Sequence, residues 1–358
     1  MGEDLTFLRG HGILIQQNRC LLTREGENEM YVADMHCDTI SVLLHRQKKG
    51  ERVSLRSNDL MVDLEKMRQG EYLLQTFAAF VNYGRVENAL ENALEMIDLF
   101  YQQMEQNADW IRPVTCWTEI ERNQREGYMS ALLSVEEGAA CKGNPAYLRT
   151  LYRLGVRMMT LTWNYENELA YPNQTAEDHP HGRIPDTVRG LKEKGFEILE
   201  EMERLGMIID VSHLSDRGFW DVYEHTKKPF IASHSNARAV GPHCRNLTDP
   251  MIRVLAERGG VTGINYCSAF LDQDGTGSHP GTLEEMSAHI RYLMRLGGED
   301  LVGLGSDFDG ISKAPEQQNC AGMQRLADQL YKDGLTTGQI EKIFYKNVYR
   351  VFREILQG

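Results

Sequence analysis

The feature of this sequence that most constrains its fold is a series of eight short apolar runs with the residue types of β-strands, separated by helical patterns. The runs cover residues 30–36, 72–81, 130–136, 156–163, 206–213, 229–234, 260–266 and 301–307. The segments between them carry apolar residues at spacings of three and four, which is typical of amphipathic helices. One of these segments, VRGLKEKGFEILEEMERLG, ends in Gly206, a residue type that commonly stops a helix.

This alternation predicts a parallel sheet with helices on both faces, because near-continuous apolar strands are covered from both sides. Eight strands, each followed by a helix, favour a (β/α)8 TIM barrel. An open doubly wound sheet is the alternative, but no G-x-G-x-x-G motif follows any of the runs. The sequence contains no repeat or linker that marks a domain boundary. We therefore expect one barrel domain over residues 1–358, with an N-terminal extension of about residues 1–29 packing on it.

Side chains of the types that bind metals stand at the ends of five runs. His36 and Asp38 are two positions apart at the end of the first run, so they face the same side of a strand. The third, fifth, sixth and eighth runs end at Glu136, His213, His234 and Asp307. The carboxyl ends of parallel strands converge on one rim of a barrel, where barrel enzymes keep their active sites. We therefore expect these side chains to lie close together.

Each of these residues also has an ordinary explanation. A lone histidine after an apolar run, such as His213 or His234, is more often a hydrogen-bonded core residue than a ligand. Glu136 is followed by a second acidic residue, so it could be a solvated loop carboxylate. Asp307 could be a turn residue or a helix N-cap. Independent explanations of this kind do not predict ligand-type residues at five separate strand ends.

Burial at the rim favours metal binding, because carboxylates and imidazoles held there without partners are costly. Both groups are ligands that divalent ions such as Zn²⁺ accept. Five such ligands suit two metal ions about 3.5 Å apart, joined by one bridging carboxylate and a bridging hydroxide. Bound metal lowers the pKa of water towards roughly 7, which supplies a nucleophile at neutral pH.

The charge and the cysteines of the chain narrow its setting. The 39 basic and 52 acidic side chains give a net charge of −13, whereas a nucleic-acid-binding protein usually presents a positive surface. We therefore expect neither nucleic acid nor an acidic membrane surface as a partner. The seven cysteines are scattered without a C-x-x-C pair, and the sequence shows no signal-like segment or membrane-length apolar run. These features predict a protein of the reducing cytoplasm.

The motifs, in their order along the chain, resemble those of the membrane (renal-type) dipeptidases, peptidase family M19 of the amidohydrolase superfamily. The shared motifs are the H-x-D of His36 and Asp38, the glutamate in SVEEG, DVSH, SHSNARAV followed by RN, and GSDFDG. The likeness extends from about residue 30 to the C-terminal NVYRVF, and the motifs together are highly specific. It implies a TIM barrel of the metal-dependent hydrolase type whose binuclear zinc site hydrolyses dipeptides, including those with a D-residue in second position.

The resemblance also implies which residues bind the two zinc ions, or other divalent ions in their place. The ligands of one ion would be His36 and Asp38, those of the other His213 and His234, and the bridge between the ions would be Glu136. We choose Glu136 over its neighbour Glu137 because it directly follows the apolar run in the V-E-x-G setting of the family.

Further roles are implied for residues that would act on the substrate. Asp307 would carry a proton from the bridging water to the leaving amine. Arg245, eleven residues after His234, would bind the terminal carboxylate of the dipeptide, although a surface ion pair is the alternative. Where mammalian members have a histidine in an L-T-H pattern, this chain has Trp163, which could instead form an apolar wall. Tyr266, at the end of the seventh run, would line the pocket or pack in the core.

Two other functions stay open. A different metal hydrolase of this superfamily, acting on a cyclic amide, a lactone or a phosphoester, would share the fold, because a fold does not fix a function. A non-catalytic metal-binding protein would keep the ligands but would not need Asp307. Family members often form dimers, so we expect a homodimer. We also expect the loop at 164–186, which is poor in apolar residues, to fold over the substrate.

Overall fold

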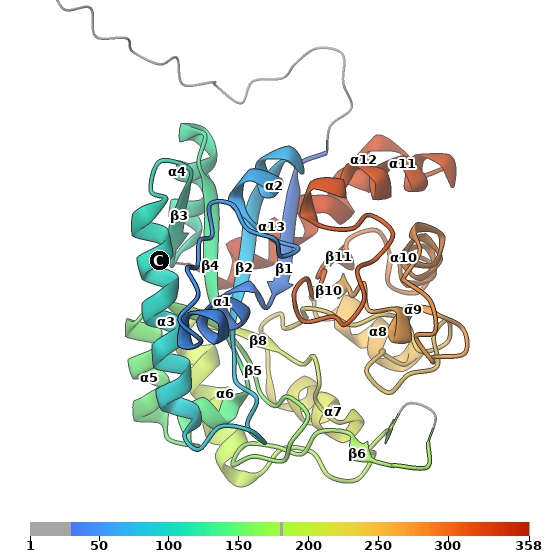
Figure 1. The fold of residues 1–358 in the computed structure, drawn as a ribbon. Coiled ribbons are helices and arrows are strands. Elements are labelled where there is room, and N and C mark those ends of the chain that lie inside the picture. The colour runs from blue at the N-terminus through green and yellow to red at the C-terminus, as the bar shows by residue number, and fades with distance from the viewer. Residues whose placement is uncertain (1–29, 180–181, 358) are drawn as a thin grey trace, which may run out of the picture.

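The computed structural model describes residues 30–179 and 182–357 of the chain, so the predicted N-terminal extension lies outside the described residues. Eight parallel strands close into a barrel that helices surround (Figure 1). The barrel strands are β1 (Val32–Cys37), β2 (Tyr72–Phe80), β4 (Met129–Glu136), β5 (Val156–Thr160), β8 (Ile208–Asp210), β9 (Ile231–Ala232), β10 (Val261–Ile264) and β11 (Val302–Leu304). The ring closes where β2 pairs with β4, with Phe80 opposite Glu136. Each predicted run overlaps one barrel strand, and the TIM barrel is confirmed.

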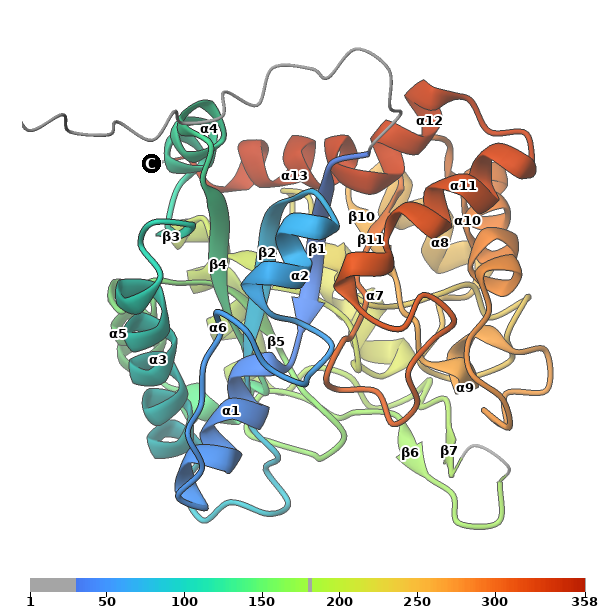
Figure 2. The same cartoon turned by 45° about the horizontal axis from the view of Figure 1, so that its top comes forward.

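The barrel strands are buried along almost their whole length because they are covered from inside and outside. All eight residues of β4 are buried. One apolar cluster joins strand residues such as Met35 and Leu132 to Val351 and Phe352 of the last helix, α13 (Asn347–Ile355). Figure 2 shows α13 lying across the end of the barrel at which the strands begin. The opposite end, where the strands finish, is therefore the one available for a site.

Helices follow most of the strands and pack their apolar faces on the barrel. They are α1 (Thr39–Lys48), α2 (Leu64–Gln69), α3 (Ala89–Gln106), α4 (Trp117–Glu126), α5 (Pro145–Arg153), α6 (Glu193–Leu205), α7 (Asp216–His225), α8 (Asp249–Glu257), α9 (Ser268–Leu271), α10 (Leu283–Gly297), α11 (Gln324–Lys332), α12 (Thr337–Glu341) and α13. As predicted, α6 stops at Gly206, which takes the left-handed φ of 71° that glycine tolerates. None of the helices in the described ranges is long and apolar enough to cross a membrane.

Three strands lie outside the prediction. β3 (Ile111–Val114) pairs with the first half of β4, but its sequence IRPV contains a proline and only its two end residues are buried. β6 (Gln174–Thr175) and β7 (Arg183–Ile184) form a two-residue antiparallel pair within the loop at 164–186. Such short or half-exposed strands leave little apolar pattern in a sequence.

Candidate active site

The residues predicted at the strand ends converge at the carboxyl end of the barrel. His36 Nε2 lies 3.3 Å from Glu136 Oε2 and 3.8 Å from Asp38 Oδ2. His213 Nε2 lies 3.0 Å from Glu136 Oε1 and 3.0 Å from His234 Nε2. All five side chains are buried. The two oxygens of Glu136 therefore face two different groups of side chains, one on each side.

The backbone at the strand ends sets these positions. Glu136 is the last residue of β4, and Asp38 directly follows β1 as the N-cap of α1. His213 lies in the turn after β8 with a φ of 69°, and Asp307 follows β11 with a φ of 60°. Left-handed backbone is uncommon for residues other than glycine, and it is found mostly at functional sites, where neighbouring contacts hold it.

The imidazole rings of His213 and His234 are each oriented by a hydrogen bond at Nδ1, the ring nitrogen that does not face the other histidine. Ser233 Oγ donates its hydrogen to Asp210 Oδ2 at 2.5 Å, so it accepts the 2.7 Å bond from His234 Nδ1. His213 Nδ1 donates to Asn164 Oδ1 at 3.2 Å. With Nδ1 protonated in each ring, both Nε2 atoms present lone pairs, and these lie 3.0 Å apart. Two facing lone pairs repel each other unless a cation accepts them, as in metal sites whose histidines donate their other nitrogen.

Burial also sets the charges of the cluster. It lowers the pKa values of His213 and His234 well below the usual value, so both are neutral at neutral pH. Burial, reinforced by the negative charge of Asp38, raises the pKa of Glu136 to about 7 and that of Asp307 to about 6. The pKa of His36 differs from these two: burial lowers it, but the negative charges of Glu136 and Asp38 outweigh burial and raise it well above the usual value. The neutral imidazoles of His213 and His234 beside crowded carboxylates are donors that a divalent cation stabilises.

Two buried candidate ligand atoms, His36 Nε2 and Asp38 Oδ1, have no hydrogen-bond partner in the described part of the chain. An unpaired buried polar atom is costly, and metal coordination is one way to remove that cost. Gly310 lets its loop approach the carboxylates, because a Cβ at this position would overlap Asp38 Oδ2 and Asp307 Oδ1. The residues present therefore fit divalent metal ions.

Asp307 lies at the edge of the cluster. Its Oδ1 is 3.9 Å from His36 Nε2, and its Oδ2 accepts a 3.0 Å hydrogen bond from Asn265 Nδ2. Ligand atoms of His36, Asp38 and Asp307 lie within 4.8 Å of one another. The pKa of about 6 leaves Asp307 ionised at neutral pH, able to accept a proton.

Arg245 is buried beside the cluster and carries no matching negative charge. Its Nη1 lies 3.4 Å from Ser235 Oγ, and its Nη2 lies 3.4 Å from the carbonyl oxygen of His234. Its Nε has no hydrogen-bond partner among the described residues, and the carboxylates of Asp307 and Glu136 act on its charge without hydrogen-bonding to it. Since only 6% of Arg245 is exposed, the alternative of a surface ion pair is wrong. A buried guanidinium of this kind favours an anionic ligand.

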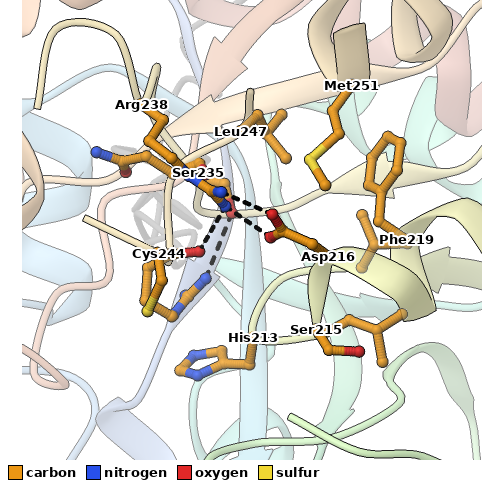
Figure 3. Close-up of a pocket in the computed structure, with 13 residues that line it drawn as sticks. His213, Ser215, Asp216, Phe219, Ser235, Arg238, Cys244, Leu247 and Met251 are labelled. Carbon is orange, nitrogen blue, oxygen red and sulfur yellow. Dashed lines mark hydrogen bonds and ion pairs between the residues drawn. The ribbon is translucent and has the colours of Figure 1, made fainter. Parts of the chain in front are cut away.

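A pocket lined by His213 and Arg245 also contains an ion pair in its lining, between Arg238 and Asp216 (Figure 3). Arg238 Nη1 and Nη2 each lie 2.7 Å from an oxygen of Asp216, and Nη2 also donates to the carbonyl oxygen of Cys244 at 3.0 Å. These contacts fix the segment that carries Arg245. The apolar lining of the pocket consists of Val211, Leu214, Phe219, Leu247 and Met251.

The two other predicted substrate contacts differ in exposure. Trp163 is half-buried at the rim, with its ring centroid 6.1 Å from that of His213 and 4.9 Å from that of Phe80. Tyr266 has no exposed surface, and its hydroxyl lies 3.8 Å from Met323 Sδ. The contacts of Tyr266 are those of a residue packed in the core, whereas Trp163 can be reached from solvent.

Glu137 is a site residue that sequence reasoning considered only as an alternative to Glu136. Its carboxylate turns away from the histidines: Oε2 accepts a 2.9 Å bond from the backbone nitrogen of Trp163, and Oε1 accepts bonds from Ala139 N and Asn167 Nδ2. Its φ of 107° is far from that of an ordinary strand residue. The adjacent pair of glutamates is the signal that could have drawn attention to it.

Two buried aspartates behind the ligands were also not predicted. Asp34 Oδ1 accepts from the backbone nitrogens of His36 at 3.2 Å and Ser306 at 3.0 Å. Asp210 Oδ1 accepts from the backbone nitrogen of Ser233 at 2.8 Å, and its other oxygen accepts from the Ser233 hydroxyl that orients His234. The short spacing of aspartate before histidine in ADMH and DVSH is the signal in the sequence.

The loop at 164–186 contacts the site through its described residues. Asn164 reaches His213, and Arg183 Nη2 donates to the carbonyl oxygen of Asn164 at 2.9 Å. Asn173 Nδ2 donates to the carbonyl oxygen of Cys244 at 3.1 Å. The loop is thus tied both to a histidine of the cluster and to the segment that precedes Arg245.

Known proteins resemble this chain in fold and in amino-acid sequence. The family model for membrane dipeptidase (peptidase family M19) matches residues 23–357. An uncharacterised dipeptidase of Schizosaccharomyces pombe is 33% identical over 307 residues, which cover 82% of this chain and 71% of the relative. A dipeptidase of Aspergillus oryzae is 30% identical over 305 residues, with coverages of 82% and 70%. A metallopeptidase of Rhodobacter sphaeroides superposes on this chain with a TM-score of 0.83 at 25% identity, and the match covers 91% of this chain and 99% of that one. The crystal structure of that protein is liganded with a phosphinate mimic of the dipeptide L-Ala-D-Ala.

Proposed function

The chain belongs to the membrane dipeptidase family, peptidase family M19, and from this premise we propose that it hydrolyses the peptide bond of dipeptides by means of two divalent metal ions, with zinc as the expected metal. The observation that carries the proposal is the position of Glu136. One of its oxygens lies 3.3 Å from His36 Nε2 and the other 3.0 Å from His213 Nε2. These two distances support a bridging role for this single carboxylate.

The ligands proposed for the two sides of this bridge are those that the family resemblance implies. His36 and Asp38 would hold one ion, and His213 and His234 would hold the other. The facing Nε2 lone pairs of His213 and His234, and the unpaired Asp38 Oδ1, support this assignment. When bound, two divalent ions polarise the scissile carbonyl and lower the pKa of water towards roughly 7, so that hydroxide serves as the nucleophile.

Asp307 would move the proton. Its carboxylate is held by Asn265 and faces the ligand cluster, and it is ionised at neutral pH. It would accept a proton from the attacking water and donate it to the nitrogen of the leaving amine, a role worth about 10²- to 10⁴-fold in rate.

Arg245 would bind the C-terminal carboxylate of the dipeptide. Its buried guanidinium has no carboxylate partner among the described residues and lines the pocket beside His213. This observation favours a dipeptide over a cyclic amide or a lactone, because those substrates need not carry a free carboxylate. The dipeptide mimic bound by the Rhodobacter sphaeroides relative supports the same substrate class, with L,D-dipeptides included.

A metal analysis followed by a panel of L,L- and L,D-dipeptides tests the proposal. Each dipeptide is paired with its C-terminal amide, which lacks the carboxylate. We expect Arg245→Ala to raise KM for the dipeptides roughly tenfold or more while leaving the amides unchanged, as loss of a charge-assisted contact predicts. The control is Arg204→Ala, which removes a surface arginine paired with Glu201. A metal-loaded protein that cleaves no member of the panel would instead support the non-catalytic alternative.

We also propose a cytoplasmic location and a homodimer. The described cysteines, which are free thiols, are Cys37, Cys116, Cys141, Cys244, Cys267 and Cys320. Free thiols support a reducing compartment. The homodimer rests on family membership alone, and light scattering of the metal-loaded protein tests it.

A further inference from the structure

An aromatic wall stands at the rim of the site beside His213. It consists of Phe80 at the end of β2, Trp163 after β5, and Tyr165 two residues further on. The ring centroid of Trp163 lies 4.9 Å from that of Phe80 and 5.7 Å from that of Tyr165. Phe80 and Trp163 are half-buried, and 40% of Tyr165 is exposed. Gly84 backs the wall, because a Cβ there would overlap the Tyr165 ring. The site therefore presents open aromatic surface on this side.

Hydrogen bonds on both sides of Trp163 hold the wall in place. Glu137 Oε2 accepts from the backbone nitrogen of Trp163 at 2.9 Å. Arg183 Nη2 donates to the carbonyl oxygen of Asn164, whose side chain accepts from His213. The φ of 107° at Glu137 is strained for a side-chain-bearing residue, and such strain persists where surrounding contacts over-determine it. The position of the indole is thus coupled to the strand end that carries Glu136.

Phe80 of the aromatic wall and Arg245 lie on opposite sides of the ligand cluster, and Trp163, which follows β5, lies beside His213 between them. Around the closed ring the strands follow the order β1, β2, β4, β5, β8, β9, β10, β11. Arg245 contacts His234 and Ser235, which follow β9, whereas Phe80 ends β2, halfway round the ring. A dipeptide whose carboxylate contacts Arg245 and whose peptide carbonyl lies at Glu136 therefore extends its N-terminal residue towards the wall.

On the basis of the proposed dipeptidase function, we propose that the aromatic wall binds the side chain of the N-terminal residue and selects dipeptides with a large apolar or aromatic residue there. Aromatic rings bury large apolar areas and add a preferred ring geometry. Glu137 acts as a positioning residue, since it touches the backbone of Trp163 and not the substrate. The residue that replaces the histidine of mammalian family members thereby becomes a determinant of substrate choice.

Two series of dipeptides test this inference through kcat/KM. The first series varies the N-terminal residue in Gly-Ala, Leu-Ala and Phe-Ala, and the second varies the C-terminal residue in Ala-Gly, Ala-Leu and Ala-Phe. We expect the wild type to prefer Phe-Ala to Gly-Ala by roughly tenfold or more, the size of effect that apolar pockets give. Trp163→Ala should abolish most of that preference, while its effect on the second series should be the same for all three members.

Two further variants, a conservative substitution of Trp163 and a matched control at another tryptophan, complete the test. Trp163→Phe retains a smaller ring and should lose part of the preference, so it replaces Trp163→Ala if the latter does not fold. The matched control is Trp117→Phe at the start of α4, where Trp117 packs 5.1 Å from Tyr349 of α13 at the far end of the barrel. This control should leave both series unchanged. Metal content is measured for every variant, and it should equal that of the wild type.

The outcomes separate this inference from the proposed function. If the wild type cleaves neither series, the dipeptidase proposal fails and the inference fails with it. If the wild type cleaves both series but Trp163→Ala lowers every kcat/KM by one common factor, the dipeptidase proposal stands and the wall is not the subsite of the N-terminal residue. If the preference changes in the second series instead, the wall contacts the C-terminal residue and the inference is overturned.

Discussion

Replacing Glu136 with glutamine tests two properties of this residue: its proposed metal-bridging role, and its effect on the free energy of unfolding of the metal-free protein. Burial raises the pKa of Glu136 from the ordinary 4.5 to about 7, so the metal-free folded protein binds this proton more tightly than the unfolded chain does. The contribution of Glu136 to the free energy of unfolding is therefore intact below about pH 4.5 and is lost as the pH rises to about 7. Glutamine has nearly the same size and does not ionise.

The size of the effect follows from the two pKa values. A tenfold change in an equilibrium constant is worth about 1.4 kcal/mol, so the full difference between 4.5 and about 7 corresponds to about 3 kcal/mol. At pH 5, which is above 4.5, part of this stabilisation of the wild type has already been lost. Between pH 5 and pH 8, we expect the free energy of unfolding of metal-free Glu136→Gln to improve relative to that of the wild type by about 2 to 3 kcal/mol.

Urea unfolding of both proteins in the presence of a chelator, at pH 5 and pH 8, measures this difference. Groups whose titration does not depend on Glu136 cancel in the comparison, including His213 and His234, whose lowered pKa values act in the opposite direction. His36 does not cancel, because the charge of Glu136 raises the pKa of His36 against the effect of burial. Added zinc at pH 8 should then stabilise the wild type more than the variant, by mass action. An identical difference between variant and wild type at both pH values would refute the reasoning from burial. A variant that retained two metal ions would remove Glu136 from the bridge.

Three other variants test individual side chains of the same site. Asp307→Asn should lower kcat by about 10²- to 10⁴-fold and keep the metal, because an amide can no longer accept the proton; metal analysis that shows a lost ion would make Asp307 a ligand instead. His213→Ala should lower both metal content and rate, and unchanged zinc in this variant would exclude it from the ligands. Asp210→Asn should weaken metal binding about 10- to 100-fold, because the Ser233 hydroxyl that orients His234 loses its anionic acceptor. Competition with a chromophoric chelator measures the metal affinity, and an affinity equal to that of the wild type would show that this hydrogen bond is not needed.

The barrel strands could be predicted because strands covered on both faces leave near-continuous apolar runs in the sequence. Their ends could not be predicted from the same pattern. The run at 229–234 reads as one strand, yet only Ile231–Ala232 pair in the sheet. Ser233 and His234 leave the ladder because their backbone nitrogens donate to side chains, to Asp210 Oδ1 at 2.8 Å and to Ser212 Oγ at 3.1 Å. Local hydrophobicity carries no information about such long-range contacts.

The convergence of the strand-end side chains could be predicted because imidazole and carboxylate groups in this order are chemically distinctive, and the structure brings them together. The role of Glu137 and the whole of Arg183 were missed because these side chains bond to backbone atoms of Trp163 and Asn164. A contact to backbone leaves no recognisable pair of side chains in the sequence. For Tyr266 the sequence predicts a place at a strand end but not the direction of the ring. The ring packs away from solvent, with its hydroxyl near Met323.

The two aspartates behind the ligands limit how this barrel can be redesigned. Asp34 and Asp210 are completely buried, and each holds backbone at a ligand-bearing strand end. An engineer who refilled the interior with aliphatic residues, or grafted only the histidines onto another scaffold, would discard the supports that aim the imidazoles. Transplanting this centre therefore means moving each aspartate together with the strand end that it anchors.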